Sequence, residues 1–205
     1  MSYGLSTTIH IGDKDYNIRC KGDYRMVLDC FNALNDIEMS KDYRIATAVV
    51  IFYEDCNSID DICNVFGDNY VTAVEKMFCF FNTNQSNVGT KCNFRLIDWD
   101  NDSQIICAAV NSVAHTEIRS LEYVHWFTFM GWYMSVGESV LATVVEIRNK
   151  IVTGKKLEKY EQKFRKDNPY YFMWNSKTAE QIEEENEIMA LWNAEQREVK
   201  QWKVV

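Results

Sequence analysis

The middle of the chain is its most continuously apolar stretch. Residues 121–134 read LEYVHWFTFMGWYM, which places aromatic and sulfur-containing side chains on every side of a helical wheel. A helix that is apolar all round belongs in a protein core or in a membrane. At roughly 21 Å it is too short to span a bilayer. The pattern therefore predicts a buried core helix over residues 121–134, against which the rest of the chain packs.

The first residues predict a β-hairpin. Polar and apolar positions alternate over residues 6–11 and again over 16–20, and a Gly-containing turn at 12–15 separates the two runs. An isolated hairpin is marginally stable in water, so this one is expected to lie against helices.

Helical spacing begins at Asp23 and continues to about residue 81. The first predicted helix has one apolar face formed by Tyr24, Val27, Leu28, Phe31 and Leu34. A second helix is expected from Ser40, which is a good N-cap residue, and a short helix capped by Ser58 should end near Gly67. Asp68 is expected to cap a further helix over 69–81, whose buried stripe would be Val71, Val74, Met77, Phe78 and Phe81.

The second half of the chain also reads as helical. Residues 82–92 (NTNQSNVGTKC) show no periodicity and are predicted to form a long loop within one fold. Helices are expected over 103–115, after the acidic run 98–102, and from about residue 140 to 152. The predicted fold is mainly α: a multi-helix bundle with an N-terminal β-hairpin, formed by residues 1–167.

The last part of the chain changes in charge. Residues 148–166 hold eight basic residues against two glutamates, and the only proline, Pro169, should end this segment. An aromatic cluster occupies 170–174, and a Glu-rich helix is expected after Ser176. Residues 168–205 are therefore predicted to be a C-terminal helical arm.

The composition narrows the classes of function. A net charge of -8 argues against general binding to nucleic acid, because phosphates repel an acidic protein. Seven scattered cysteines without a C-x-x-C pair, together with the absence of an N-terminal signal peptide, favour a reducing cytoplasm, and no membrane segment is expected.

Chemical motifs are largely missing. Residues 98–102 begin like an EF-hand loop, but Ser103 and Ala109 stand where the glycine and the bidentate glutamate are needed, so helix capping is the favoured interpretation. The three histidines show no zinc spacing, and His125 reads as a core residue. A cysteine nucleophile such as Cys92 or Cys107 remains an alternative. We expect no cofactor, metal or catalysis.

Two groups of residues are candidates for binding a partner. The aromatic group contains Tyr170, Tyr171, Phe172, Trp174 and Trp192, which suit either the edge of a core or an interface. The basic group contains Lys155, Lys156 and Lys159. These lysines are either solvated helix faces or a patch for an acidic partner, such as residues 180–187 of a neighbouring copy, so a homo-oligomer is expected.

Three blocks of sequence, taken in order, resemble the bacteriophage gene-product-fifteen family of small tail proteins. The first is 16–36, which begins YNIRCKGDYRMVL and ends LND, followed by a helix ending at 52–54 (FYE). The second is 96–100 (LIDWD), followed by a helix. The third is 121–129 (LEYVHWFTF) with 144–148 (VVEIR). The resemblance covers roughly residues 5–167.

The resemblance implies a tail assembly chaperone in the cytoplasm of the bacterial host. Its expected partners are the tape-measure protein and other tail proteins, with apolar stripes of the tape-measure helix kept soluble while tail subunits polymerise. The main alternative is a structural tail protein that stays in the virion, and the second is a cysteine-dependent enzyme. Mass spectrometry of purified particles would distinguish these two, because a chaperone should be absent from them.

Overall fold

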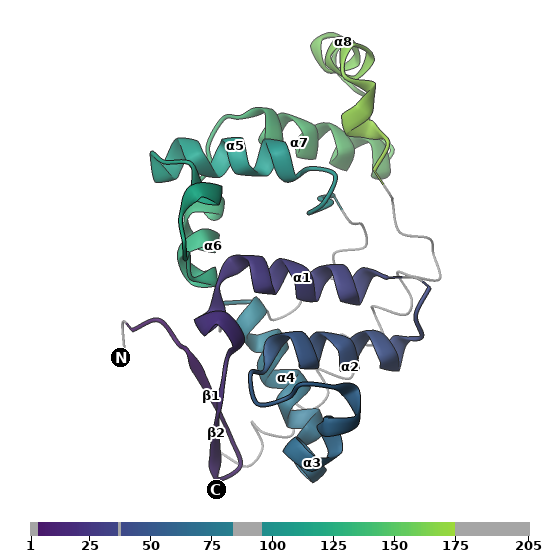
Figure 1. Ribbon diagram of the computed structural model, residues 1–205. Coiled ribbons are helices and arrows are strands. Elements are labelled where there is room, and N and C mark those ends of the chain that lie inside the picture. Colours follow the sequence, from purple (N-terminus) through teal and green to yellow (C-terminus); the bar gives the residue numbers. More distant parts are fainter. Residues whose placement is uncertain (1–3, 37, 84–95, 175–205) are drawn as a thin grey trace, which may run out of the picture. The chain divides into compact units, whose positions relative to one another are not determined.

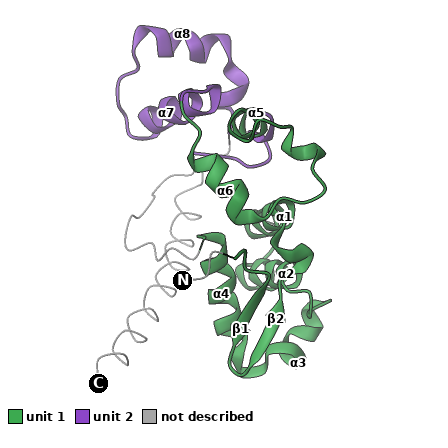
Figure 2. Cartoon of the chain, turned by 90° about the vertical axis from the view of Figure 1, so that its left-hand side faces the viewer, with its two compact units in different colours: residues 1–87, 105–137 green, residues 88–104, 138–205 purple. Residues whose placement is uncertain are grey.

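The computed structural model describes residues 4–36, 38–83 and 96–174 (Figure 1). It divides into two compact units, which are coloured separately in Figure 2: residues 1–87 with 105–137, and residues 88–104 with 138–205. The described part is mainly helical and has a two-stranded sheet at its start, which confirms the predicted fold class. Among the described residues, no helix combines the length and apolarity needed to cross a membrane.

The hairpin of the first unit forms as predicted. Strand β1 (Thr8–Ile11) pairs with β2 (Lys14–Asn17) in antiparallel register, with Ile9 opposite Tyr16. Gly12 has a φ of 61° in the connecting turn, a conformation that glycine adopts without a steric cost. The buried Ile9, Ile11 and Tyr16 share one face of the sheet.

The helices of the first unit begin mostly where their capping residues predicted. They are α1 (Tyr24–Asn35), α2 (Lys41–Phe52), α3 (Ile62–Phe66), α4 (Tyr70–Phe81), α5 (Ser103–Ala114, from Ile105 onward) and α6 (Trp126–Met134). The side chain of Ser40 accepts a hydrogen bond from the Tyr43 N–H, and Ser58 accepts one from the Asp61 N–H. The prediction that Asp68 caps α4 is wrong, because a 3₁₀ turn (Gly67–Asn69) leads directly into the helix.

Aromatic side chains fill the core of this unit. Phe52 and Tyr53 at the end of α2 meet Phe80, Phe81 and Phe66 edge to face, with ring centroids 4.9 to 5.6 Å apart. The predicted stripe of α4 is rotated: Ala73, Met77, Phe80 and Phe81 are buried, whereas Val71 is 55% exposed. The helix thus faces inward with its larger rings, which bury more apolar area.

The central stretch differs most from its prediction. Helix α6 starts only at Trp126, and residues 121–125, which were expected to be helical, are not. Asp23 forms an antiparallel bridge with His125, and the Tyr24 N–H donates to the Val124 carbonyl at 2.9 Å. Pairing with the start of α1 therefore replaces the expected first helical turn.

The expectation that this helix is buried on all sides is also wrong. Of α6, Trp126 and Phe129 are buried, whereas Met134 is 68% exposed. Phe129 stacks on Tyr24 of α1 at 4.6 Å, and Trp126 meets Phe31 of α1 at 5.8 Å. Helix α6 thus packs by one face, as an ordinary surface helix does.

The second unit contains α7 (Val140–Val152), α8 (Lys159–Asp167) and the 3₁₀ turn η5 (Pro169–Phe172), together with the segment 96–102. Helix α7 covers the predicted range of about 140–152, and the Ser139 side chain caps its start by accepting a hydrogen bond from the Ala142 N–H. Helix α8 starts with a capping box, in which the Glu158 N–H donates to Glu161 Oε2 at 2.7 Å. Leu141, Val144 and Ile147 form the buried face of α7.

Candidate partner-binding site

The aromatic residues that follow α8 form a compact turn. We call residues 169–174 the aromatic turn. Pro169 occupies the first position of η5, where its missing N–H is not needed and its fixed φ suits the turn. Phe172 meets Phe164 of α8 edge to face, with ring centroids 6.3 Å apart. The turn is therefore packed against the helix that precedes it.

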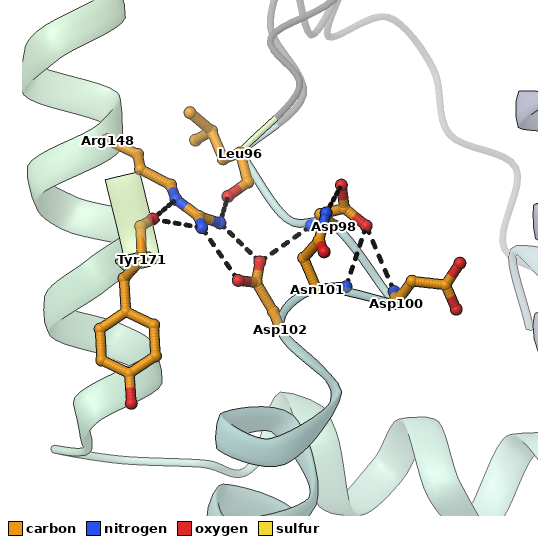
Figure 3. Close-up of polar contacts among 7 residues, drawn as sticks. All are labelled: Leu96, Asp98, Asp100, Asn101, Asp102, Arg148 and Tyr171. Atoms are coloured by element: carbon orange, nitrogen blue, oxygen red, sulfur yellow. Dashed lines mark hydrogen bonds and ion pairs between the residues drawn. The ribbon is translucent and has the colours of Figure 1, made fainter. Parts of the chain in front are cut away.

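Arg148 of α7 fixes this turn through its guanidinium group, as Figure 3 shows. Its Nε and Nη2 both donate to the Tyr171 carbonyl, the former at 2.9 Å. Nη1 donates to the Leu96 carbonyl at 2.8 Å, and the two Nη atoms donate to the two carboxylate oxygens of Asp102. These five hydrogen bonds use all five N–H donors of an arginine. Arg148 is 1% exposed, so none of its charge faces solvent.

The loop that supplies Asp102 is held by its own carboxylates. Asp98 Oδ1 accepts from the N–H groups of Asp100 and Asn101, at 3.2 and 3.3 Å. Asp102 Oδ2 also accepts from the Asp98 N–H at 2.9 Å (Figure 3). Both buried carboxylates therefore already have donors. In the described ranges 4–36, 38–83 and 96–174, no three His, Cys, Asp or Glu side chains gather as metal ligands would.

A hollow of about 230 Å³ opens beside the ion pair. It is lined by Asn101, Asp102, Arg148, Tyr170, Met173 and Trp174. The ring of Trp174 covers the guanidinium, with its centroid 4.8 Å from Arg148 Cζ, a favourable cation–π geometry. Tyr170 and Met173 are 65% and 77% exposed. The hollow thus joins a rigid polar floor to an exposed apolar rim.

The structure places the other candidate residues in different settings. Tyr171 and Phe172 are half-buried, and Lys155, Lys156 and Lys159 are exposed around the start of α8. Trp192 lies outside the described residues. The basic group and the described members of the aromatic group all belong to the second unit.

Two basic residues of the 148–166 segment are not surface charges. Arg148 belongs to the basic run of the sequence, but its side chain is buried and paired with Asp102. Lys150 Nζ lies 3.0 Å from Glu146 and 2.5 Å from the buried Glu161. The hydrogen bond from Lys150 lowers the pKa of Glu161, and the backbone N–H of Glu158 lowers it further. Sequence reasoning therefore missed Arg148, Asp102 and Met173 as parts of the site.

Burial affects the reactivity of two of the described cysteines, one of which is the candidate nucleophile Cys107. Burial raises the pKa of the Cys107 thiol and also that of Cys30. A raised pKa decreases the fraction of thiolate, which is the reactive form. Cys92, the other candidate nucleophile, falls outside the described residues.

Comparison with known proteins identifies the family. A family model described as Bacteriophage Gp15 protein matches residues 3–173, which is most of the chain. The chain belongs to the bacteriophage Gp15 family. The match confirms the resemblance drawn from the three sequence blocks, and the Gp15 region extends from the hairpin through Met173 of the aromatic turn. No curated protein and no solved structure is significantly similar to the chain.

Proposed function

We propose that this Gp15 protein is a tail assembly chaperone that binds the tape-measure protein in the cytoplasm of the infected bacterium. The observation that carries the proposal is the aromatic turn held by Arg148 beside an open hollow, in a chain of a phage family. The proposed activity is reversible binding of another chain, without catalysis.

The aromatic turn has the properties of a binding hot spot. Tyrosine, tryptophan and arginine are enriched among the residues that dominate binding energies, and Tyr170 and Met173 expose large side chains. Two hydrogen bonds from Arg148 hold the Tyr171 carbonyl of the turn before any partner arrives. The other three fix Arg148 itself to the loop 96–102. Preorganisation of this kind reduces the entropy lost on binding.

The hollow is suited to one apolar side chain of a helical partner. Amphipathic helices are commonly recognised by inserting residues spaced three or four apart into an apolar groove. In this proposal a tape-measure side chain enters the hollow, and Met173 adapts to its shape because methionine is flexible and polarisable. Several such contacts along a long partner would keep its apolar stripes out of water.

A paired set of variants tests the site. Tyr170→Ser with Met173→Ser removes the exposed rim, and Tyr43→Ser with Met134→Ser removes the same two side-chain types in the other unit. All four positions are exposed, so the folds should survive. Co-purification with the tape-measure protein of the same phage should weaken about tenfold or more for the first pair only. Equal binding by both pairs would rule out this site.

Mass spectrometry of purified virions separates the chaperone from the structural alternative. It should not detect the protein if it is a chaperone, whereas a structural tail protein would be present in fixed copy number.

Two truncations test the role of the aromatic turn. A chain that ends after Trp174 keeps the Tyr171 carbonyl that Arg148 binds, whereas a chain that ends after Asp167 lacks that acceptor. The chain that ends after Trp174 should fold and still bind, and the chain that ends after Asp167 should be less stable.

A further inference from the structure

Helix α8 and the loop before it carry a basic surface with few acidic side chains beside it. We define the basic surface as the exposed side chains of Lys155, Lys156, Lys159, Lys163, Arg165 and Lys166. None of these six side chains forms an ion pair with any residue in the described ranges. The exposed acidic side chains next to them are Glu158 and Asp167, so the surface is strongly positive.

The internal pairing of α8 leaves this surface uncompensated. Glu161 lies on the same helix, but it is 1% exposed and its carboxylate is bound by Lys150 of α7. Its charge is thus directed into the second unit, away from the lysines around it. A surface with six positive charges against two negative ones attracts acidic groups, in a chain whose net charge is nevertheless -8.

The chain itself contains a matching acidic segment. Residues 180–187 (EQIEEENE) hold five glutamates and no basic residue. The last described residue, Trp174, comes two residues after Phe172, whose ring contacts Phe164 in the middle of α8. The six residues from 174 to 180 can reach about 20 Å, whereas α8 is only about 13 Å long. The acidic segment can therefore reach the basic surface of its own chain.

We propose that the basic surface of α8 binds the acidic segment 180–187 of the same chain. A tether of about six residues gives a local concentration in the millimolar range, well above that of a second copy in solution. Intramolecular contact therefore takes precedence over the contact between copies that the charges alone would also permit. The contact also holds the chain that follows the aromatic turn against α8, next to the hollow.

Carbodiimide cross-linking of the full-length protein tests this contact. The reagent joins a lysine amine directly to a glutamate carboxylate when the two are in contact. An equal mixture of ¹⁴N- and ¹⁵N-labelled protein distinguishes links within one chain from links between chains. We expect same-isotope links from Lys155, Lys156 and Lys166 to residues 180–187, and these links should decrease when salt is raised to 0.5 M.

Charge-matched variants provide the control. Lys159→Glu with Lys163→Glu should reduce the links from the remaining basic residues by about fivefold, as expected for the loss of two exposed ion pairs. Lys14→Glu with Lys76→Glu changes the net charge equally in the other unit and should leave them unchanged. Mixed-isotope links would show that a second copy supplies the segment and would overturn the proposal. Links that respond to neither salt nor the α8 variant would also overturn it. No partner is added, so the result is independent of tape-measure binding.

Discussion

Arg148 and Asp102 form a buried ion pair although they are 46 residues apart in the chain. The pair joins the loop 96–102 to α7, and the remaining donors of Arg148 join α7 to the aromatic turn. A buried ion pair is weak evidence for stability, because desolvation offsets much of the attraction. Its role here is to position three segments of the second unit, and removing one partner would leave a buried charge.

Asp102→Leu should destabilise the second unit by about 3–5 kcal/mol, because the Arg148 guanidinium stays buried without its counter-ion. Asp167→Leu changes an exposed carboxylate of the same unit and should cost no more than about 0.5 kcal/mol. Chemical denaturation of both variants measures the difference. Equal midpoints would show that the pair does not hold the unit together.

Trp126→Ala should cost about 3–5 kcal/mol of the free energy of unfolding, since Trp126 is 1% exposed and its Nε1 donates to the Phe81 carbonyl at 2.9 Å. Trp132→Ala, in the same helix, removes a half-buried ring and should cost clearly less. A thermal midpoint that is unmoved by the first change would contradict the placement of Trp126 in the core.

Gly22→Ala and Gly154→Ala separate backbone strain from a steric clash. Both glycines have positive φ, 78° and 68°, which should cost an alanine about 1–2 kcal/mol at either position. A Cβ at Gly22 would lie 2.9 Å from Phe80 Cζ and 3.1 Å from His125 Nε2, whereas nothing lies within 4 Å at Gly154. Gly22→Ala should therefore cost about 1–3 kcal/mol more. Similar unfolding free energies for the two variants would mean that the core around Phe80 yields freely.

Glu161 should make folding stability depend on pH. Lys150 lowers the pKa of Glu161 in the folded state below its value of about 4.3 in the unfolded chain. The stabilisation is therefore complete above about pH 5 and is lost as the pH falls through the folded pKa. Glu161→Gln should lower the thermal midpoint at pH 7, and the difference from the natural protein should shrink toward pH 3. Glu138→Gln, at an exposed position, serves as the control. A difference that does not vary with pH would point to lost packing instead.

The local elements of this protein were largely predictable from its sequence. Alternation identified the hairpin, and Ser40 and Ser58 marked the starts of helices because their hydroxyls satisfy backbone N–H groups at those positions. Pro169 likewise marked the end of α8. These signals act within a few residues, so they do not depend on the rest of the fold.

The start of α6 and the burial of its side chains depend on long-range contacts, which the local sequence pattern does not predict. Asp23 accepts a hydrogen bond from the Val124 N–H and bridges to His125, which keeps the residues before Trp126 out of the helix. An apolar side chain such as Met134 reads as core in the sequence, yet it is exposed. Apolarity permits burial, but only the packing of α6 by one face against α1 decides which side chains are covered.

The helical class, the hairpin and many helix boundaries follow from the amino-acid order, because they depend on residue spacing and local hydrogen bonding. The membership of the Gp15 family is likewise a property of the sequence. The burial of Arg148 with Asp102, away from the surface lysines, is known only from the three-dimensional fold. The sequence around an arginine does not indicate whether its guanidinium group is surrounded by water or paired with a carboxylate. Its role depends on which distant segments meet it, and long-range packing determines that.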